Sequence, residues 1–150
     1  MKKILSKNAV IIGLTFLIPG IIAFITKDSF KMYNSLVRPK LSPPGVIFPI
    51  VWNILYLLMS VAVIMVKNNN EDNLKIYYIQ LVLNALWTPI FFLFKLYYLA
   101  LIELIVLLVI VIYMTYKFSQ NNKSTLYLLV PYIAWLLFAL YLNLFIAIYN

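Results

Sequence analysis

The sequence contains no cysteine and no histidine, and its only acidic residues are Asp28, Glu71, Asp72 and Glu103. Without cysteine the chain can form no disulfide, no thiolate metal site and no cysteine nucleophile. Without histidine it lacks the commonest general base and the commonest metal ligand. These absences exclude most conventional acid–base and metal-dependent catalysis. We therefore predict no metal site, no resident cofactor and no conventional catalytic constellation.

What is present is apolar. Hydrophobic residues make up 65% of the 150 residues and charged residues only 11%, whereas soluble chains are about half apolar and a quarter charged. A chain this short cannot bury so much apolar surface in water. Five apolar stretches have about the 20 residues that a helix needs to cross a bilayer, and they cover residues 8–26, 46–66, 76–94, 96–116 and 126–149. The alternation typical of a transmembrane β-strand is missing, because runs such as LIVLLVIVIY are apolar on every face. We therefore predict an all-α integral membrane protein with a single five-helix transmembrane domain over 1–150.

The connections between these stretches differ greatly in length. Residues 67–75 and 117–125 are expected to be polar turns, and Lys95 alone separates the third stretch from the fourth, which predicts a tight antiparallel hairpin. Residues 27–45 are much longer and contain Pro39, Pro43 and Pro44. Long loops in compact domains are often lids or binding elements. We expect this first loop to fold over one end of the bundle.

The charged residues lie almost entirely in these connections and give the chain a net charge of +8. Basic loops beside anionic lipid headgroups account for this charge, so we predict the lipid bilayer as a partner and no nucleic acid. The positive charges are slightly more numerous on the side that carries the N-terminus, which favours a cytoplasmic N-terminus.

Three of the stretches carry polar and aromatic side chains at helical spacing. Because polar groups facing lipid are costly, these faces are expected to look into the bundle. Pro19, Pro49, Pro89 and Pro131 lie within the stretches, and prolines kink helices and make room between them. The three faces are Phe48, Trp52, Leu55 and Tyr56; Gln80, Asn84, Trp87, Thr88 and Phe91; and Pro131, Trp135, Phe138, Ala139, Leu142 and Asn143.

Two interpretations of these faces remain open at this stage. In the first, Trp52, Trp87 and Trp135 line a chamber for a large planar apolar ligand, to which Asn84, Asn143 and Gln80 supply hydrogen bonds. In the second, the amides simply bond across helices and the aromatic rings are ordinary packing.

Glu103 is the one ionisable residue well inside a stretch. An intramembrane carboxylate suggests a proton relay or a counter-ion, which would suit a small secondary transporter or efflux subunit. The alternative is a structural glutamic acid that shares a hydrogen bond with a backbone or hydroxyl group of a neighbouring helix. We favour the structural interpretation, because a relay normally needs a second titrating group within reach.

Four segments of the sequence together resemble the translocator protein family, whose bacterial members are the TspO or tryptophan-rich sensory proteins. They occur in the family's order and lie in the first loop, the second, the third and the fifth helix. Ala100 and Glu103 fall where the family tends to have an acidic residue, whereas Leu41, Val46 and Leu99 stand where members often have tryptophan. The four segments are Tyr33 to Gly45; Phe48, Val51, Trp52, Leu55 and Tyr56; Asn84, Trp87, Pro89 and Phe91; and Pro131, Trp135, Phe138, Ala139, Leu142 and Asn143.

The resemblance implies a homodimeric five-helix bundle, in a bacterial cell membrane, with a ligand chamber under the first loop. It also implies binding of porphyrins, above all metal-free protoporphyrin IX. Trp52 and Trp135 match the tryptophans connected with light-dependent breakdown of bound porphyrin, so we place any photochemical role on them. The ligand-binding residues expected on this basis are Arg38, Phe48, Val51, Trp52, Tyr56, Asn84, Trp87, Phe91, Trp135, Phe138, Ala139, Leu142 and Asn143.

The residue types favour a ligand without a coordinated metal. In the absence of histidine and cysteine, a haem iron would have to be held by methionine or tyrosine, which are less usual as sole ligands. A metal-free macrocycle held by stacking fits better, and its propionates are expected to meet Arg38 or Lys40 at the chamber mouth. The predicted function is a membrane tetrapyrrole-binding protein that acts as sensor, scavenger or carrier. Whether it also degrades the porphyrin in light, as an enzyme would, stays open.

Overall fold

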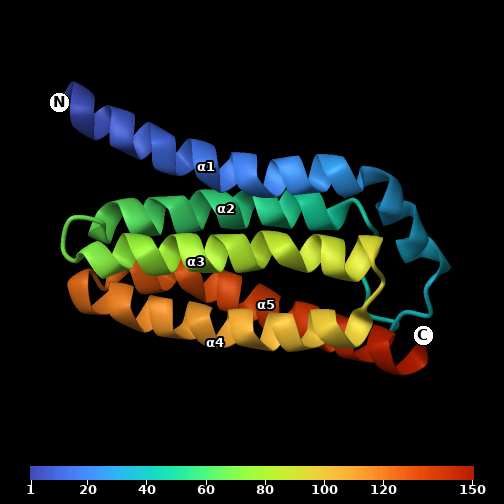
Figure 1. Cartoon of the computed structure of the whole chain (residues 1–150). Coiled ribbons are helices and arrows are strands. Elements are labelled where there is room, and N and C mark those ends of the chain that lie inside the picture. The colour runs from blue at the N-terminus through green and yellow to red at the C-terminus, as the bar shows by residue number, and fades with distance from the viewer.

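The computed structural model describes residues 1–150 and consists of helices with no strand, joined by short connections except for the long first loop between the first two long helices. Five long helices lie side by side in a bundle (Figure 1). All five are long and apolar enough to cross a membrane, which confirms the predicted fold class. They are α1 (Lys2–Thr26), α2 (Ile47–Val66), α3 (Glu71–Thr88), α4 (Tyr97–Asn121) and α5 (Ser124–Tyr149).

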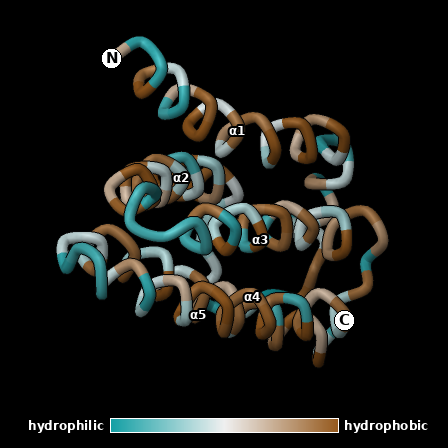
Figure 2. Tube along the Cα trace, turned by 60° about the vertical axis from the view of Figure 1, so that its left-hand side comes forward, coloured by the Kyte–Doolittle hydropathy of each residue, from teal (hydrophilic) through white to brown (hydrophobic).

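The bundle has two unlike ends. The first loop and the C-terminus lie together at one end, and the turns between α2 and α3 and between α4 and α5 lie at the other (Figure 1). Helix α1 packs on α2 and α3, while α4 and α5 pack on each other. Hydrophobic residues dominate the helices, and the turn between α2 and α3 is hydrophilic (Figure 2).

The helices extend further than the apolar stretches. Helix α1 begins at Lys2, α3 begins at Glu71 and α4 continues to Asn121, so the polar turns predicted at 67–75 and 117–125 are shorter than expected. Apolar content marks where the bilayer ends, but a helix continues into water until a capping residue stops it. At the start of α3 the Asn70 side chain accepts a hydrogen bond from the backbone N–H of Asp72 at 2.9 Å.

The connection between α3 and α4 is the tight hairpin that Lys95 predicts. Pro89 lacks a backbone N–H, and the five residues Pro89–Leu93 form a π-helical turn, η2, in place of a continued α-helix. The chain then reverses at Lys95, whose φ of 55° is in the left-handed region. This turn sets the aromatic side chains of Phe91 and Phe92 at the first-loop end.

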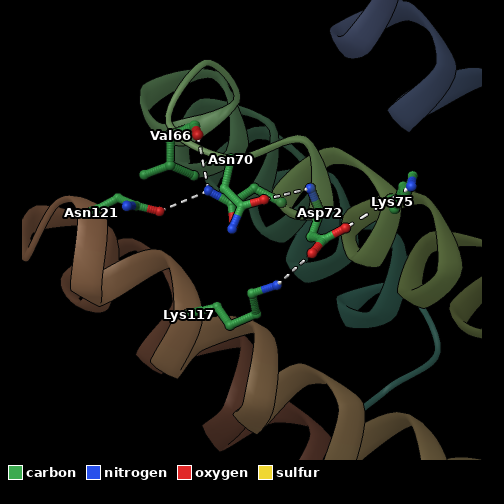
Figure 3. A network of polar contacts seen from close by, with 7 residues as sticks. Val66, Asn70, Asp72, Lys75, Lys117 and Asn121 are labelled. Carbon is green, nitrogen blue, oxygen red and sulfur yellow. Dashed lines mark hydrogen bonds and ion pairs between the residues drawn. The ribbon is translucent and has the colours of Figure 1, made fainter.

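The well-packed core lies in the half of the bundle away from the first loop. Met59, Val63, Tyr77, Val111 and Met114 are completely buried there. A group of polar residues closes this end, and Figure 3 shows it around the start of α3. We call this half of the molecule the closed end, and the half under the first loop the cavity end.

Candidate functional site

The cavity end encloses a cavity of about 520 Å³. This volume lies within the roughly 300–1,000 Å³ typical of small-molecule sites. All five helices and the first loop contribute to its wall, which is mostly aromatic and aliphatic. The lining residues are Phe16, Pro19, Gly20, Ala23, Phe30, Tyr33, Gly45, Phe48, Pro49, Trp52, Asn53, Tyr56, Asn84, Trp87, Thr88, Phe91, Phe92, Leu104, Trp135, Ala139, Leu142, Asn143 and Ile146.

Most of the side chains predicted to bind ligand lie in this wall. Val51, Phe138 and Arg38 do not. Val51 packs against the hydrophobic core, and Phe138 packs against Trp135 with ring centroids 5.5 Å apart. Those that do line the cavity are Phe48, Trp52, Tyr56, Asn84, Trp87, Phe91, Trp135, Ala139, Leu142 and Asn143.

The three tryptophans form the flat parts of the wall. Trp52 and Trp135 stand perpendicular to each other with ring centroids 6.4 Å apart. Trp52 stacks on Tyr56 at 5.6 Å, and Trp87 stacks on Phe91 at 4.8 Å. Extended aromatic faces of this kind can hold a planar ligand by offset stacking or edge contacts.

Helix α1 supplies a part of the wall that was not predicted. Phe16, Pro19, Gly20 and Ala23 all line the cavity. A Cβ atom added at Gly20 would meet nothing within 4 Å, so the helix leaves open space at this point. The helix carries no tryptophan, and its one amide, Asn8, does not line the cavity. The small residues next to Pro19 were the signal that could have found this part of the wall.

The first loop forms the roof as a 3-10 helix, η1 (Lys27–Ser35), followed by an irregular segment. The Tyr33 hydroxyl donates to the Pro43 carbonyl at 3.2 Å, which ties the two halves of the loop together. Beyond the roof, the Asn150 side chain accepts from the backbone N–H of Val37 and donates to its carbonyl, both at 2.9 Å. The end of the chain thereby holds the loop in place.

Arg38, which is expected to meet ligand carboxylates at the mouth of the cavity, is not part of the cavity wall. Its guanidinium lies over the ring of Tyr33, 4.3 Å from the centroid, and Tyr33 itself lines the cavity. A planar cation packs well on an aromatic face. The roof residue therefore separates Arg38 from the interior.

The wall is solvent-exposed on one side only. The exposed lining residues, Gly20, Phe30, Gly45, Pro49 and Asn53, all belong to α1, the first loop or α2. Every lining residue from α3, α4 and α5 is buried or half-buried. The cavity therefore opens between α1 and α2, beneath the first loop.

The sequence left open whether the amide side chains line a chamber or bond across helices, and two of them do both. Asn84 and Asn143 line the cavity, and both also bond across helices. Asn143 accepts from Trp87 Nε1 and donates to the Tyr97 carbonyl, each at 3.0 Å. Gln80 is completely buried, does not line the cavity and bonds to Tyr132 and Met59 of two neighbouring helices, as the second interpretation expects.

Glu103 lies beside the wall without forming part of it. Its neighbour Leu104 lines the cavity, while both carboxyl oxygens of Glu103 are buried and have no hydrogen-bond partner. The hydrogen bond to a neighbouring helix that we expected is therefore not formed. The indole N–H of Trp135 is likewise buried and unpaired.

The sequence is similar to known proteins along most of its length. The TspO/MBR family model matches residues 9–149. The tryptophan-rich protein TspO of Chlorobaculum tepidum is 32% identical over 126 residues, which cover 80% of this chain and 80% of that protein. The tryptophan-rich sensory protein of Cereibacter sphaeroides is 36% identical over 115 residues, with coverages of 75% and 73%.

A third relative, the protein CrtK of Rhodobacter capsulatus, is 39% identical over 66 residues, which are 40% of this chain and 41% of that protein. The family match extends over nearly the whole chain and includes residues from every helix. Together with the five helices that can cross a bilayer, these similarities identify a multi-pass integral membrane protein.

Proposed function

Because this chain belongs to the TspO/MBR family, we propose that it binds a metal-free tetrapyrrole of the protoporphyrin IX type. It would act as a membrane sensor, scavenger or carrier of that ligand. A relative that carries the name tryptophan-rich sensory protein supports the sensory role.

The observation that carries the proposal is the tryptophan-lined cavity. It combines a volume of about 520 Å³ with three indole rings in one wall. It also opens sideways between α1 and α2, so a ligand dissolved in the bilayer can enter without crossing the aqueous loops. A planar apolar macrocycle would exchange lipid contacts for stacking contacts on Trp52, Trp87 and Trp135.

A second candidate function is light-dependent degradation of the bound tetrapyrrole. The specific observation in its favour is the pair of perpendicular indoles, Trp52 and Trp135, on one side of the cavity. An excited porphyrin held against them would have an oxidisable side chain in contact. The reactivity would come from the excited ligand and dissolved oxygen, since the chain itself contributes no acid–base pair of the usual kind.

The test is titration of the purified protein with protoporphyrin IX, followed by the porphyrin absorbance bands in darkness and then under illumination. We expect saturable binding in darkness, weakened by Trp52→Phe and by Trp135→Phe. Tyr113→Phe is the matched control, because Tyr113 is an exposed aromatic residue of α4 outside the cavity. Absence of saturable binding to the wild-type protein would refute the proposed function.

Illumination separates the two candidate functions. Stable bands under light, with binding intact, support a sensor, scavenger or carrier alone. Loss of the bands in the wild-type protein, reduced in Trp52→Phe and Trp135→Phe but unchanged in Tyr113→Phe, supports degradation. The homodimer that the family resemblance implies is a separate prediction, and the mass of the protein–detergent complex measured by light scattering tests it.

A further inference from the structure

A chain of hydrogen bonds runs from the cavity wall into the core. The Tyr56 hydroxyl donates to Asn84 Oδ1 at 2.9 Å, and Asn84 Nδ2 donates to the Tyr132 hydroxyl at 2.7 Å. The Tyr132 hydroxyl donates to Gln80 Oε1 at 2.8 Å, and Gln80 Nε2 donates to the sulfur of Met59 at 3.6 Å. Tyr56 and Asn84 line the cavity, whereas the other three side chains are fully buried.

The buried end of this chain determines its direction. A thioether sulfur can accept a hydrogen bond but cannot donate one, so the amide nitrogen of Gln80 must face Met59. The carbonyl oxygen of Gln80 then accepts from Tyr132, whose oxygen in turn accepts from the amide nitrogen of Asn84. The reverse direction would set the Gln80 carbonyl against the sulfur, leaving two buried acceptors without a donor, which is unfavourable.

The same constraint reaches the cavity at Tyr56. Because the Asn84 carbonyl oxygen is the acceptor at that position, the Tyr56 proton is directed to Asn84 and is not available to a ligand. The phenol oxygen keeps a lone pair, so a tyrosine that could donate or accept elsewhere is here an acceptor only.

We propose that Tyr56 is a specificity-determining residue of the cavity, which accepts a hydrogen bond from an N–H or O–H group of the ligand. It thereby selects planar apolar ligands that carry such a donor over ligands of the same shape that lack it. This inference rests on the proposed function, because it assumes that the cavity binds a ligand. A net hydrogen bond of this kind corresponds to about a fivefold difference in affinity.

The test uses phenanthridin-6(5H)-one and its N-methyl derivative, two planar apolar compounds that differ only in carrying a lactam N–H or an N–CH₃ group. Their dissociation constants are measured by tryptophan fluorescence with the full-length protein in phosphatidylcholine nanodiscs. We expect the ratio of the two constants to favour the N–H compound about fivefold more in the wild-type protein than in Tyr56→Phe. Comparing ratios cancels the effect of the methyl group itself.

A second pair of variants tests whether discrimination between the two compounds depends on the direction of the hydrogen bonds or only on the shape of the cavity wall. Met59→Leu removes the sulfur acceptor while nearly conserving volume, so the Gln80 amide is no longer held in one orientation. We expect this variant to discriminate less between the two compounds although Tyr56 is intact. Met114→Leu, at an equally buried methionine of α4 with no hydrogen bond, is the control and is expected to discriminate as the wild-type protein does.

The outcomes distinguish this inference from the proposed function. If the protein binds protoporphyrin IX but binds neither lactam, the inference alone is overturned. The same holds if the ratio of the two dissociation constants is the same with and without the Tyr56 hydroxyl. Equal discrimination by Met59→Leu and Met114→Leu also overturns it. A protein that binds neither protoporphyrin IX nor either probe overturns the proposed function together with the inference.

Discussion

The closed end and the cavity end are both built mostly from apolar side chains, but the side chains fill the space at the closed end and surround a cavity at the other. At the closed end Met59, Val63, Tyr77 and Met114 fill the space between helices and are completely buried. At the cavity end larger rings, including Trp52, surround a space of about 520 Å³. Apolar composition therefore does not by itself decide whether a region becomes a packed core or the wall of a cavity.

The positions of the prolines account for part of the difference. Pro19 and Pro49 line the cavity, and Pro89 begins the π-helical turn at the same end. Pro19 inside α1 and Pro89 at the end of α3 each remove a backbone N–H that a regular helix would use, whereas Pro49 lies in the first turn of α2, where a proline breaks no helical hydrogen bond. Pro131 is the exception, because it is exposed on α5 and lines no cavity.

Polar groups also serve different purposes at the two ends. At the closed end the Asn73 side chain donates to the Val66 carbonyl at 2.9 Å and to Asn121 Oδ1 at 2.8 Å, which joins α3 to the end of α2 and to α4 (Figure 3). At the cavity end the amides of Asn84 and Asn143 bond across helices and also face the interior space. The polar groups of the closed end only join helices, whereas those of the cavity end both join helices and line the candidate site.

The largest expected effect comes from opening a second cavity, at the closed end. Met114→Ala removes a fully buried side chain from the core, and such changes lower the free energy of unfolding by about 2–5 kcal/mol. Trp52 lies in a wall that already borders empty space, so Trp52→Ala is expected to lower the free energy of unfolding less than Met114→Ala does. It is expected to weaken ligand binding more. Reversible unfolding in mixed micelles measures the first quantity and porphyrin titration the second. Equal stability losses in the two variants would contradict the comparison.

The next effect concerns the polar closure around Asn73. Asn73→Ala leaves the Val66 carbonyl and Asn121 without their donor, which is expected to cost about 1–3 kcal/mol. Lys117→Ala is the control in the same network. Its ion pair with Asp72 is 3.9 Å long, and the Asp72 side chain is 61% exposed, so its loss should cost less than about 1 kcal/mol. If Lys117→Ala proved the more destabilising variant, the stability of the closed end would depend on the ion pair rather than on the Asn73 amide.

A glycine pair in α1 tests the cavity end directly. Gly13 and Gly20 both have open space around an added Cβ atom, but only Gly20 lines the cavity. Gly20→Phe is expected to weaken protoporphyrin IX binding by about tenfold, because a ring would enter the ligand's space at a cost of roughly 1–3 kcal/mol. Gly13→Phe should bind like the wild-type protein. Equal affinities in both variants would place the ligand outside this cavity.

The smallest effect has the opposite sign. Glu103 places two unpaired carboxyl oxygens among buried atoms, and burying a polar group without a partner is unfavourable. Glu103→Leu is therefore expected to raise the free energy of unfolding by about 1 kcal/mol, with protoporphyrin IX binding retained because Glu103 lies outside the wall. A destabilised variant would show that the carboxyl group makes a favourable interaction in the membrane.

Sequence reasoning located the tryptophans and amides of α2, α3 and α5, because polar and bulky aromatic residues at helical spacing mark a face that avoids lipid. Val51 and Phe138 lie beside the correct stripe but do not line the cavity, because Val51 packs against the hydrophobic core and Phe138 packs against Trp135 of its own helix. The expected contact of Arg38 with ligand carboxylates stays a prediction, and its guanidinium lies on Tyr33 of the roof. The spacing of residues along one helix identifies the face that turns inward, but it does not decide which residues at the border of that face reach the cavity.

The sequence by itself determined the number of spans, the tight hairpin at Lys95 and the tryptophan faces, since each depends on local composition or on the period of one helix. Only the tertiary structure decided that α1 completes the wall at Gly20, that the cavity opens beside it, and that Met59 orients the hydrogen bonds reaching Tyr56. The physical reason is that lipid is as apolar as the interior of the bundle. The few polar side chains of α1, such as Thr15, do not line the cavity, so its sequence does not mark the face that completes the wall.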